Sequence, residues 1–484
     1  MQVECGSHDG GGSLADGERR NFLNINERKV SIMVLALFSS WMLAFPFEGR
    51  ILYAIADNYN FNPHQLVFIA VASHAAGLLF WGFFIKTKKT AKYLMLFSLA
   101  FCIIASGIFF YPPSGLWGIA LIFSSFVIAA GVVAWSFYFK SGTPKNERIK
   151  TAADGLIYAN ILMILLNMTA IHFVPRLGLG LSILMLSGAF VFALLLPVNS
   201  ESISSQPSEQ SDNQVSIFKP LLFLCLFIVV ITINSGLMYQ VIVPAFGHLK
   251  LFASWYWAVP YIIALYIMKN LPRKIKRSYI LYVAMAMLGM SFVFFMTLDR
   301  TALSYFVINT LMLGAFGVYD LFWWSILGEM LDLNKKPAGI FGIGLSANVI
   351  GVLIGGLIGK TVITSDILPD TSSALALVVV FVSLVILPLL HKHLSIVLKN
   401  HAFLSMLTEM PSSEQNKPIS NLLHFGNLSE RECQVANLLL QGKTYKKIAE
   451  ELYISENTVK FHVRNIYSKL NIQNRTELID LIYD

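Results

Sequence analysis

The sequence predicts an all-α protein that consists of a polytopic transmembrane helix bundle followed by a small helical domain of soluble composition. The 484 residues are 56% hydrophobic and only 13% charged, with a mean hydropathy of +0.63. An average soluble protein carries about 25% charged residues, so the composition argues against a purely cytosolic enzyme. After Pro388 the composition changes, and from Leu428 onward it is that of a soluble domain.

The membrane part is expected to cover residues 30–391 and to follow a polar, disordered cytoplasmic tail, residues 1–29. A helix needs about 20 apolar residues to cross a bilayer, and the apolar runs predict about twelve spans in two sets of six. A Ser- and Gln-rich loop, 198–218, connects the first set (31–197) with the second (219–391). The spans are expected near 31–54, 63–85, 93–111, 116–139, 152–173, 178–197, 219–243, 252–268, 279–297, 303–327, 339–360 and 373–391.

Basic residues lie in every second loop of this bundle. Lysines and arginines occupy 86–92, 140–150, 269–277 and 335–336, whereas 111–115 carries none. Loops rich in Lys and Arg stay in the cytoplasm. We therefore predict a multi-pass protein of the cytoplasmic membrane with both termini in the cytoplasm.

The two halves show weak internal similarity. At one constant offset, Trp135 corresponds to Trp323 and Asn160 to Asn348. Together with the arrangement of six spans, a polar connector and six spans, this pattern resembles the major facilitator superfamily. Transporters of that kind bind their substrates at the midplane between repeated halves. The loop 86–92 lacks the Asp and the Gly of that family's pattern, which counts against a transport cycle.

Asp320 lies near the middle of a predicted span. An ionisable group in hydrocarbon costs roughly several kcal/mol, so it should face a partner or a cavity. Two interpretations stay open, a ligand or proton site in a central cavity and hydrogen bonds that hold the helices together. The candidate ligand cavity is formed by Asp320, Trp135, Trp323, Asn160 and Asn348.

After a polar cytoplasmic linker, residues 392–420, the segment 421–484 predicts four helices. Each helix has a capping residue at its start and apolar residues at helical spacing on one face. A short helix, a tight turn and a longer helix make a helix-turn-helix, whose second helix enters the major groove of DNA. The predicted caps are Ser429 (with Glu432 in a capping box), Thr444, Ser455 and Asn474, the last before a helix over 475–483.

The outward face of the third helix, Glu456 to Leu470, carries Lys460, Phe461 and Arg464. Lys460 and Arg464 are one turn apart, so both can donate to guanines in one groove, and an aromatic ring can contact a thymine methyl. A solvated charged helix is the alternative, because acidic residues slightly outnumber basic ones from residue 401 onward. The basic residues that can hold phosphates include Lys446, Lys469 and Arg475.

The runs that carry a resemblance are Leu428–Glu432, Gly442–Thr444, Lys447–Ala449, Leu452–His462, Ile466–Leu470 and Arg475–Leu478. Together they resemble the LuxR/NarL/FixJ-type DNA-binding domain. The resemblance implies base contacts by Lys460, Phe461 and Arg464. It also implies backbone contacts by Thr444, Asn457, Thr458, Lys469 and Arg475. It implies a homodimer through the fourth helix, with Leu478, Leu481 and Ile482, unless these residues only close the domain's own core.

Bacterial LuxR-type regulators with about twelve transmembrane helices are a known type, which the chain resembles. The sequence thus predicts a membrane-anchored bacterial transcriptional regulator. Its C-terminal domain binds double-stranded promoter DNA, and its bundle, embedded in the lipid bilayer, is a sensor or anchor with a possible small-molecule ligand. The alternative is a major-facilitator-like secondary transporter with an appended DNA-binding regulatory domain. No enzymatic activity, cofactor or metal site is predicted, since the four cysteines lie far apart and no HExxH or GxSxG motif occurs.

Overall fold

The computed structural model describes residues 26–47, 49–198, 218–271, 277–331, 336–364, 373–390, 392, 428–441, 443–475, 477–478 and 481. Its regular elements are helices, and no strand occurs in these ranges. The predicted all-α class is thus confirmed for the described part of the chain. Most of the predicted tail, the loop 199–217 and nearly all of the predicted linker lie outside the described residues.

Ten helices of the described part are long and apolar enough to cross a membrane. Five precede the connector between the halves: α4 (His64–Phe84), α5 (Lys88–Ser106, extended by η1, Gly107–Phe110), α6 (Gly115–Gly142), α7 (Arg148–His172) and α8 (Pro175–Leu195). Five follow it: α9 (Phe218–Leu237, extended by η3, Met238–Ile242, and α10, Val243–Ala245), α13 (Arg277–Thr297), α14 (Ala302–Met330), α15 (Pro337–Thr364) and the helix Ser373–Leu390.

The remaining two of the predicted spans are each broken into shorter helices. Pro46 and Pro260 stand at the breaks, and a proline has no N–H to donate to the preceding turn of a helix. Asn26 caps the first of these helices by accepting hydrogen bonds from two backbone N–H groups, so this helix begins inside the segment expected as a tail. The pieces are α2 (Glu27–Ala44) and α3 (Arg50–Asp57), and α11 (Lys250–Trp255), η4 (Tyr256–Ala258) and α12 (Val259–Lys269).

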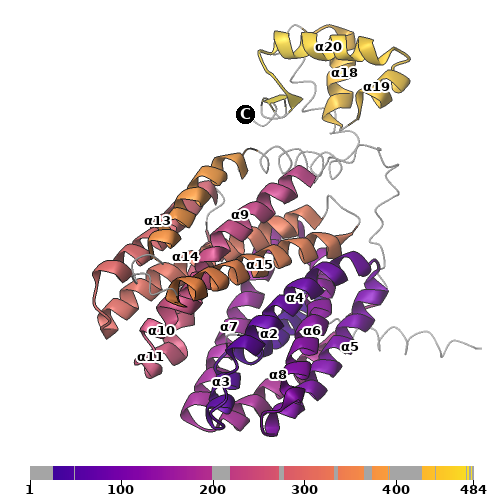
Figure 1. Cartoon of the computed structure of the whole chain (residues 1–484). Coiled ribbons are helices and arrows are strands. Elements are labelled where there is room, and N and C mark those ends of the chain that lie inside the picture. Colours follow the sequence, from indigo (N-terminus) through magenta and orange to yellow (C-terminus); the bar gives the residue numbers. More distant parts are fainter. Residues whose placement is uncertain are drawn as a thin grey trace, which may run out of the picture.

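The helices of the bundle form two groups that correspond to the two halves of the sequence. Figure 1 shows α2 to α8 together in indigo and purple, and α9 to α15 in pink and orange. The groups meet where α15 packs against α4 and where α12 and α14 pack against α7. One continuous apolar core runs through both halves. Any space between the groups is therefore lined from both halves.

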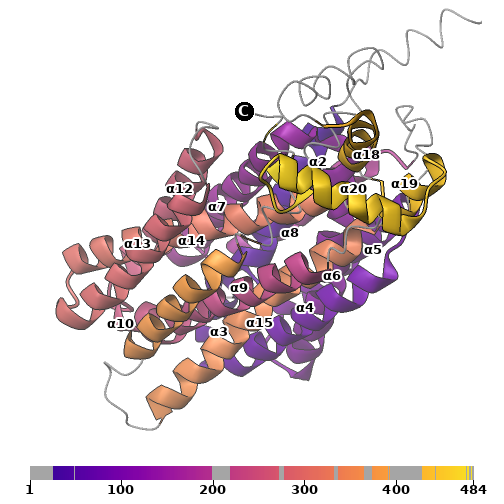
Figure 2. The ribbon, with the colours of Figure 1, turned by 90° about the horizontal axis from the view of Figure 1, so that it is seen from above.

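Helix α15 approaches α9 through glycines, and the two helices lie side by side (Figure 2). A Cβ added to Gly355 would lie 2.8 Å from the carbonyl carbon of Ile233, and one added to Gly236 would lie 2.7 Å from the carbonyl carbon of Gly355. Small residues allow backbones in a membrane to pack this closely. These glycines of α15 therefore serve packing inside the bundle.

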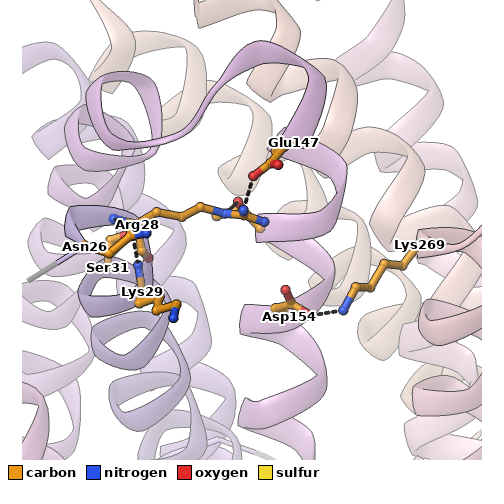
Figure 3. A network of polar contacts seen from close by, with 8 residues as sticks. Asn26, Arg28, Lys29, Ser31, Glu147, Asp154 and Lys269 are labelled. Atoms are coloured by element: carbon orange, nitrogen blue, oxygen red, sulfur yellow. Dashed lines mark hydrogen bonds and ion pairs between the residues drawn. The ribbon is translucent and has the colours of Figure 1, made fainter.

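The loops that carry the basic residues meet at one end of the bundle. Arg28 pairs with Glu147, as Figure 3 shows. Lys88 Nζ lies 2.8 Å from Oε1 of Glu27 and donates to the hydroxyl of Ser141 at 2.9 Å. These contacts join the start of α2 to the start of α5, to the end of α6 and to the loop after α6. We call this end the ion-paired end.

Two contacts at the ion-paired end join the halves to each other. Asp154 on α7 pairs with Lys269 at the end of α12 (Figure 3). The buried Arg148 donates from Nη1 to the carbonyl oxygen of Gly328 on α14 at 2.7 Å. The two halves are therefore in direct contact at this end.

The C-terminal domain has an apolar core of its own. It contains α18 (Glu430–Leu440), α19 (Tyr445–Glu451) and α20 (Glu456–Lys469). This core is separate from the core of the bundle, which gives the domain the interior that independent folding requires. The buried residues that form it are Val435, Ala436, Leu439, Ile448, Ala449, Val459, Val463 and Ile466.

Candidate nucleic-acid interface and membrane cavity

Side-chain caps determine where the helices of the C-terminal domain begin. Ser429 N donates to Oε2 of Glu432 at 2.7 Å, and Glu432 N donates to Oγ of Ser429 at 3.3 Å. The side-chain oxygens of Thr444 and Ser455 each accept a hydrogen bond from a backbone N–H three residues further on, at 3.1 Å. The capping box and both further caps were predicted from the sequence, and the geometry confirms them.

The turn between α19 and α20 is tight because α19 ends in a Schellman motif. Tyr453 has a φ of 52°, and Ile454 N donates to the carbonyl oxygen of Ala449 at 2.9 Å. This left-handed residue reverses the chain, and Ser455 then caps α20. The predicted helix-turn-helix is thus present, with α20 as its second helix.

Lys460, Phe461 and Arg464 lie together on the exposed face of α20. Phe461 is 61% exposed, and Lys460 and Arg464 are exposed as well. The opposite face of the helix packs against α18 and α19. Lys460 lies 3.4 Å from Glu456 one turn earlier, and such exposed pairs contribute well under about 1 kcal/mol. All three predicted base-contacting side chains are therefore presented outward on one helix.

The residues predicted to contact the DNA backbone fall into two groups. In the first group, Lys446 and Asn457 are exposed and Thr444 and Thr458 are half-buried. Asn457 and Thr458 belong to the first turn of α20, and the start of a helix, with its backbone N–H groups and its dipole, favours a phosphate.

Lys469 and Arg475 form the second group, whose side chains contact the domain itself. Lys469 Nζ donates to Oε2 of Glu432 at 2.7 Å. Arg475 Nη2 donates to the carbonyl oxygen of Leu440 at 3.5 Å, and burial lowers the pKa of its guanidinium. These two residues tie the end of α20 and the segment after it to α18.

Glu432 is a buried carboxylate at the centre of these contacts. Only 3% of Glu432 is exposed to solvent. Burial alone would raise its pKa, but the hydrogen bonds from Lys469 and Ser429 outweigh burial and hold the pKa of Glu432 below its ordinary value. A carboxylate with a depressed pKa in the folded state stabilises the fold above its unfolded pKa, and this stabilisation is lost as the pH falls through the folded pKa.

We expect Glu432→Gln to lower the free energy of unfolding of the C-terminal domain by about 2 kcal/mol at pH 7, because a charge-assisted hydrogen bond is lost. The loss of stability between about pH 5 and pH 3 should be shallower in the variant than in the wild type. Urea unfolding of the fragment 401–484 at several pH values measures both effects. The matched control is the exposed Glu430→Gln, which should keep the wild-type pH profile. Equal pH profiles in the wild type and Glu432→Gln would contradict the role of Glu432.

The predicted dimerisation residues differ in exposure. Leu478 is fully buried, and Leu481 is 44% exposed. Ile482 and most of the predicted fourth helix lie outside the described residues, although Glu477 N donates to Oδ1 of Asn474 at 3.0 Å, as the predicted cap requires. Leu478 thus belongs to the chain's own interior, and Leu481 is the described residue that is open to a second copy.

A cavity of about 300 Å³ lies between the two halves of the bundle. Its walls come from α2, α4, α6 and α7 of the first half and from α9, η3, η4, α12, α14 and α15 of the second. Transporters that are built from repeated halves bind their substrates at such an interface.

Asp320 lines this cavity, and neutral groups hold both of its oxygens. Tyr261 donates its hydroxyl to Oδ2 at 2.7 Å, and Trp323 donates Nε1–H to Oδ1 at 3.1 Å. Asn160 and Asn348 line the same cavity from α7 and α15. The structure thus brings four of the five residues of the predicted cavity to one space.

Trp135, the fifth residue, lies in the core instead and is not part of the cavity lining. Its ring is fully buried and stacks on Phe139 with the centroids 4.6 Å apart. Its Nε1 donates to the carbonyl oxygen of Ser31 at 2.9 Å. Trp135 and Trp323 both lie close to Trp324, but their indole N–H groups have different acceptors, the carbonyl oxygen of Ser31 and the carboxylate of Asp320.

Five further polar residues of the described lining were not among the predicted set, namely Ser39, His74, Ser235, Tyr239 and Tyr261. Tyr239 lies in the π-helix η3, and π-helical turns are frequent at functional sites. Pro244, which lacks an N–H, lies shortly after Tyr239, so a proline inside an apolar span was the available signal. No sequence signal distinguishes Tyr261 from other tyrosines of the bundle.

Comparison with known proteins separates the two parts of the chain. Residues 426–482 match the family described as GerE, bacterial regulatory proteins of the luxR family. Spore germination protein GerE of Bacillus subtilis (strain 168) is 42% identical over 65 residues, which are 13% of this chain and 77% of GerE. Transcriptional regulatory protein LiaR of the same strain is 40% identical over 76 residues, which are 14% of this chain and 36% of LiaR. The chain spans between 7% and 36% of the length of the first three curated relatives that it matches.

The helix bundle is similar in fold to a solved transporter structure. The crystal structure of the human organic anion transporter MFSD10 (TETRAN) superposes with a TM-score of 0.58 at 12% sequence identity, and the match covers 75% of this chain and 99% of that chain. At this identity the similarity concerns the fold alone. It confirms that the bundle shares its fold with a solved membrane transporter.

Proposed function

Because this chain belongs to the LuxR family of bacterial regulatory proteins, we propose that it is a membrane-anchored transcriptional regulator. In this proposal the C-terminal domain binds double-stranded promoter DNA, and the bundle is the sensor or anchor. The observation that carries the proposal is the set of Lys460, Phe461 and Arg464 on the exposed face of α20, directly after a tight turn.

The proposed DNA contacts follow from the chemistry of these side chains. Helix α20 enters the major groove, where Lys460 and Arg464 donate to guanine O6 and N7 and the ring of Phe461 contacts a thymine methyl. The first turn of α20, with Asn457 and Thr458, faces a phosphate. Phosphate contacts of this kind orient the domain, and the base contacts select the sequence.

We place the chain in the cytoplasmic membrane with both termini in the cytoplasm. The ion-paired end gathers loops that are rich in Lys and Arg, and such loops stay on the cytoplasmic side. In this orientation the C-terminal domain lies in the compartment that holds the DNA.

We further propose that two copies of the C-terminal domain bind DNA as a homodimer. The exposed Leu481 and the neighbouring Ile482 supply an apolar contact. A dimer with twofold symmetry matches paired half-sites about one helical turn apart. Attachment to the membrane raises the effective concentration of one domain near another, and the bundle can thereby control dimerisation.

DNA binding by the fragment 401–484 tests the proposal. The separate core of the domain and the match that covers 77% of GerE support the use of this fragment. In a mobility-shift assay with a library of genomic fragments, we expect a subset of sequences to be bound selectively, with an affinity that falls steeply with salt because bound phosphates release counterions. A folded fragment that bound every sequence equally at low salt would contradict the proposal.

A secondary transporter with an appended DNA-binding regulatory domain is the second candidate. The cavity between the halves and the fold of the bundle favour it, whereas the missing Asp and Gly in the loop 86–92 count against it. The two candidates differ in whether a bound compound crosses the membrane. Uptake into proteoliposomes that is lost in Asp320→Asn would support the transporter, and binding without uptake would support the sensor.

A further inference from the structure

The described lining of the membrane cavity contains an acidic residue without a basic partner of the Lys or Arg type. Among the described residues of the lining, Asp320 is the only carboxylate, and no Lys or Arg is present. His74 is the one described lining residue with a basic side chain, and its Nδ1 lies 2.9 Å from the carbonyl oxygen of Ser125, to which it can only donate. The described wall of the cavity thus offers a carboxylate and no Lys or Arg to pair with it.

Asp320 retains the capacity to bind a ligand. Tyr261 and Trp323 each use one acceptor position of the carboxylate, and an ionised carboxylate has about four such positions. Both donors are neutral, so they orient the carboxylate and leave its charge uncompensated. A buried charge in the membrane is costly unless it is paired. A cation that enters the cavity supplies the missing partner.

Seven aromatic residues also line the cavity, which is the second independent observation. Cations are attracted to the faces of aromatic rings, and Trp is the strongest partner. Trp323 and Trp324 lie beside each other with ring centroids 5.6 Å apart. The aromatic residues of the lining are Phe47, Tyr239, Trp257, Tyr261, Phe316, Trp323 and Trp324.

We propose that this cavity binds a small organic cation, a protonated amine or a quaternary ammonium ion, with Asp320 as its counter-ion and the aromatic rings around its apolar part. The proposal rests on the role of the bundle as the sensor and adds the chemical class of what it senses. An anion finds no Lys or Arg among the described lining residues. A neutral compound leaves the charge of Asp320 unpaired. The volume of about 300 Å³ is at the lower end for ligand pockets and restricts the cation to a small one.

The test is ligand binding to the purified full-length protein, measured by thermal melting and calorimetry. The cationic probes are 2-phenylethylamine, choline and tetraethylammonium, and the matched probes without a positive charge are 2-phenylethanol and phenylacetate. We expect at least one cation to stabilise the protein in a saturable way and to bind at least about tenfold more tightly than both matched probes, because the charge-assisted contact is absent in those. If no cation stabilises the folded protein, or if phenylacetate binds best, the proposal is wrong.

Variants assign the effect to Asp320. Asp320→Asn keeps the size of the side chain and should weaken cation binding about tenfold to a hundredfold, whereas Asp320→Glu should keep the preference for cations. The matched control is Asp57→Asn, an exposed carboxylate at the end of α3, which should bind like the wild type. Unchanged cation affinity in a folded Asp320→Asn protein would overturn the assignment. The comparison of probes on the wild type decides the case in which this variant does not fold. DNA binding by the fragment 401–484 is measured separately, so failure of the regulator proposal is distinguishable from failure of the ligand proposal.

Discussion

We expect Gly355→Ala to lose most of the folded, monodisperse fraction of the full-length protein. The neighbouring substitution Gly356→Ala should leave this fraction close to that of the wild type. A Cβ at position 355 would lie 2.8 Å from the carbonyl carbon of Ile233 and 3.0 Å from Cα of Gly236. Both atoms belong to the backbone of α9, so no side-chain rotation relieves the clash and the helices must separate. Overpacking of a core costs about 1–3 kcal/mol even where side chains can move.

The control variant tests helix propensity and glycine loss without the clash. A Cβ at Gly356 would meet only Cε2 of Phe68, at 3.9 Å, which is ordinary contact. Size-exclusion chromatography in detergent after a heat step measures the folded fraction of both variants. A folded fraction of Gly355→Ala equal to that of Gly356→Ala would show that α9 and α15 do not pack as described.

The second large effect is expected in DNA recognition. The double variant Lys460→Ala/Arg464→Ala should lose about 2–6 kcal/mol of the preference for the selected sequence over bulk DNA, because each base contact contributes about 1–3 kcal/mol. The melting temperature should change little, since both side chains are exposed. Competition binding with selected and unrelated DNA measures the preference.

Lys443→Ala is the matched control for loss of positive charge. Nζ of Lys443 lies 2.5 Å from Oε1 of Glu451. Lys443 is not among the residues that we propose to contact DNA bases. Its removal should weaken binding to all sequences by a similar, small factor. If the double variant and Lys443→Ala reduced the preference equally, Lys460 and Arg464 would not be the side chains that read the sequence.

The features that the sequence predicted correctly depend on local chemistry. The capping box of Ser429 and Glu432 and the caps at Thr444 and Ser455 follow from side-chain length and spacing alone. The outward face of α20 follows from helical periodicity. The lengths of the apolar runs likewise predicted ten helices that the structure contains.

The features that the sequence did not predict depend on contacts between distant segments. The breaks at Pro46 and Pro260 lie inside runs whose length alone indicated intact spans. Trp135 and Trp323 correspond in sequence and both lie close to Trp324, but the indole of Trp135 donates to the carbonyl oxygen of Ser31 and that of Trp323 donates to Asp320. The contact of Lys469 with Glu432 joins residues 37 positions apart. The pattern of charges along the sequence therefore did not indicate that Lys469 forms an ion pair inside the domain.

The central claim is that one chain resides in the membrane and binds specific DNA. The most direct measurement is crosslinking in bacterial cells that express the full-length protein, followed by isolation of the membrane fraction and sequencing of the DNA that it retains. We expect enrichment of a limited set of promoter regions with wild-type protein and loss of that enrichment with Lys460→Ala/Arg464→Ala at equal membrane abundance. DNA recovered evenly across the genome, and to the same extent with both proteins, would contradict the claim.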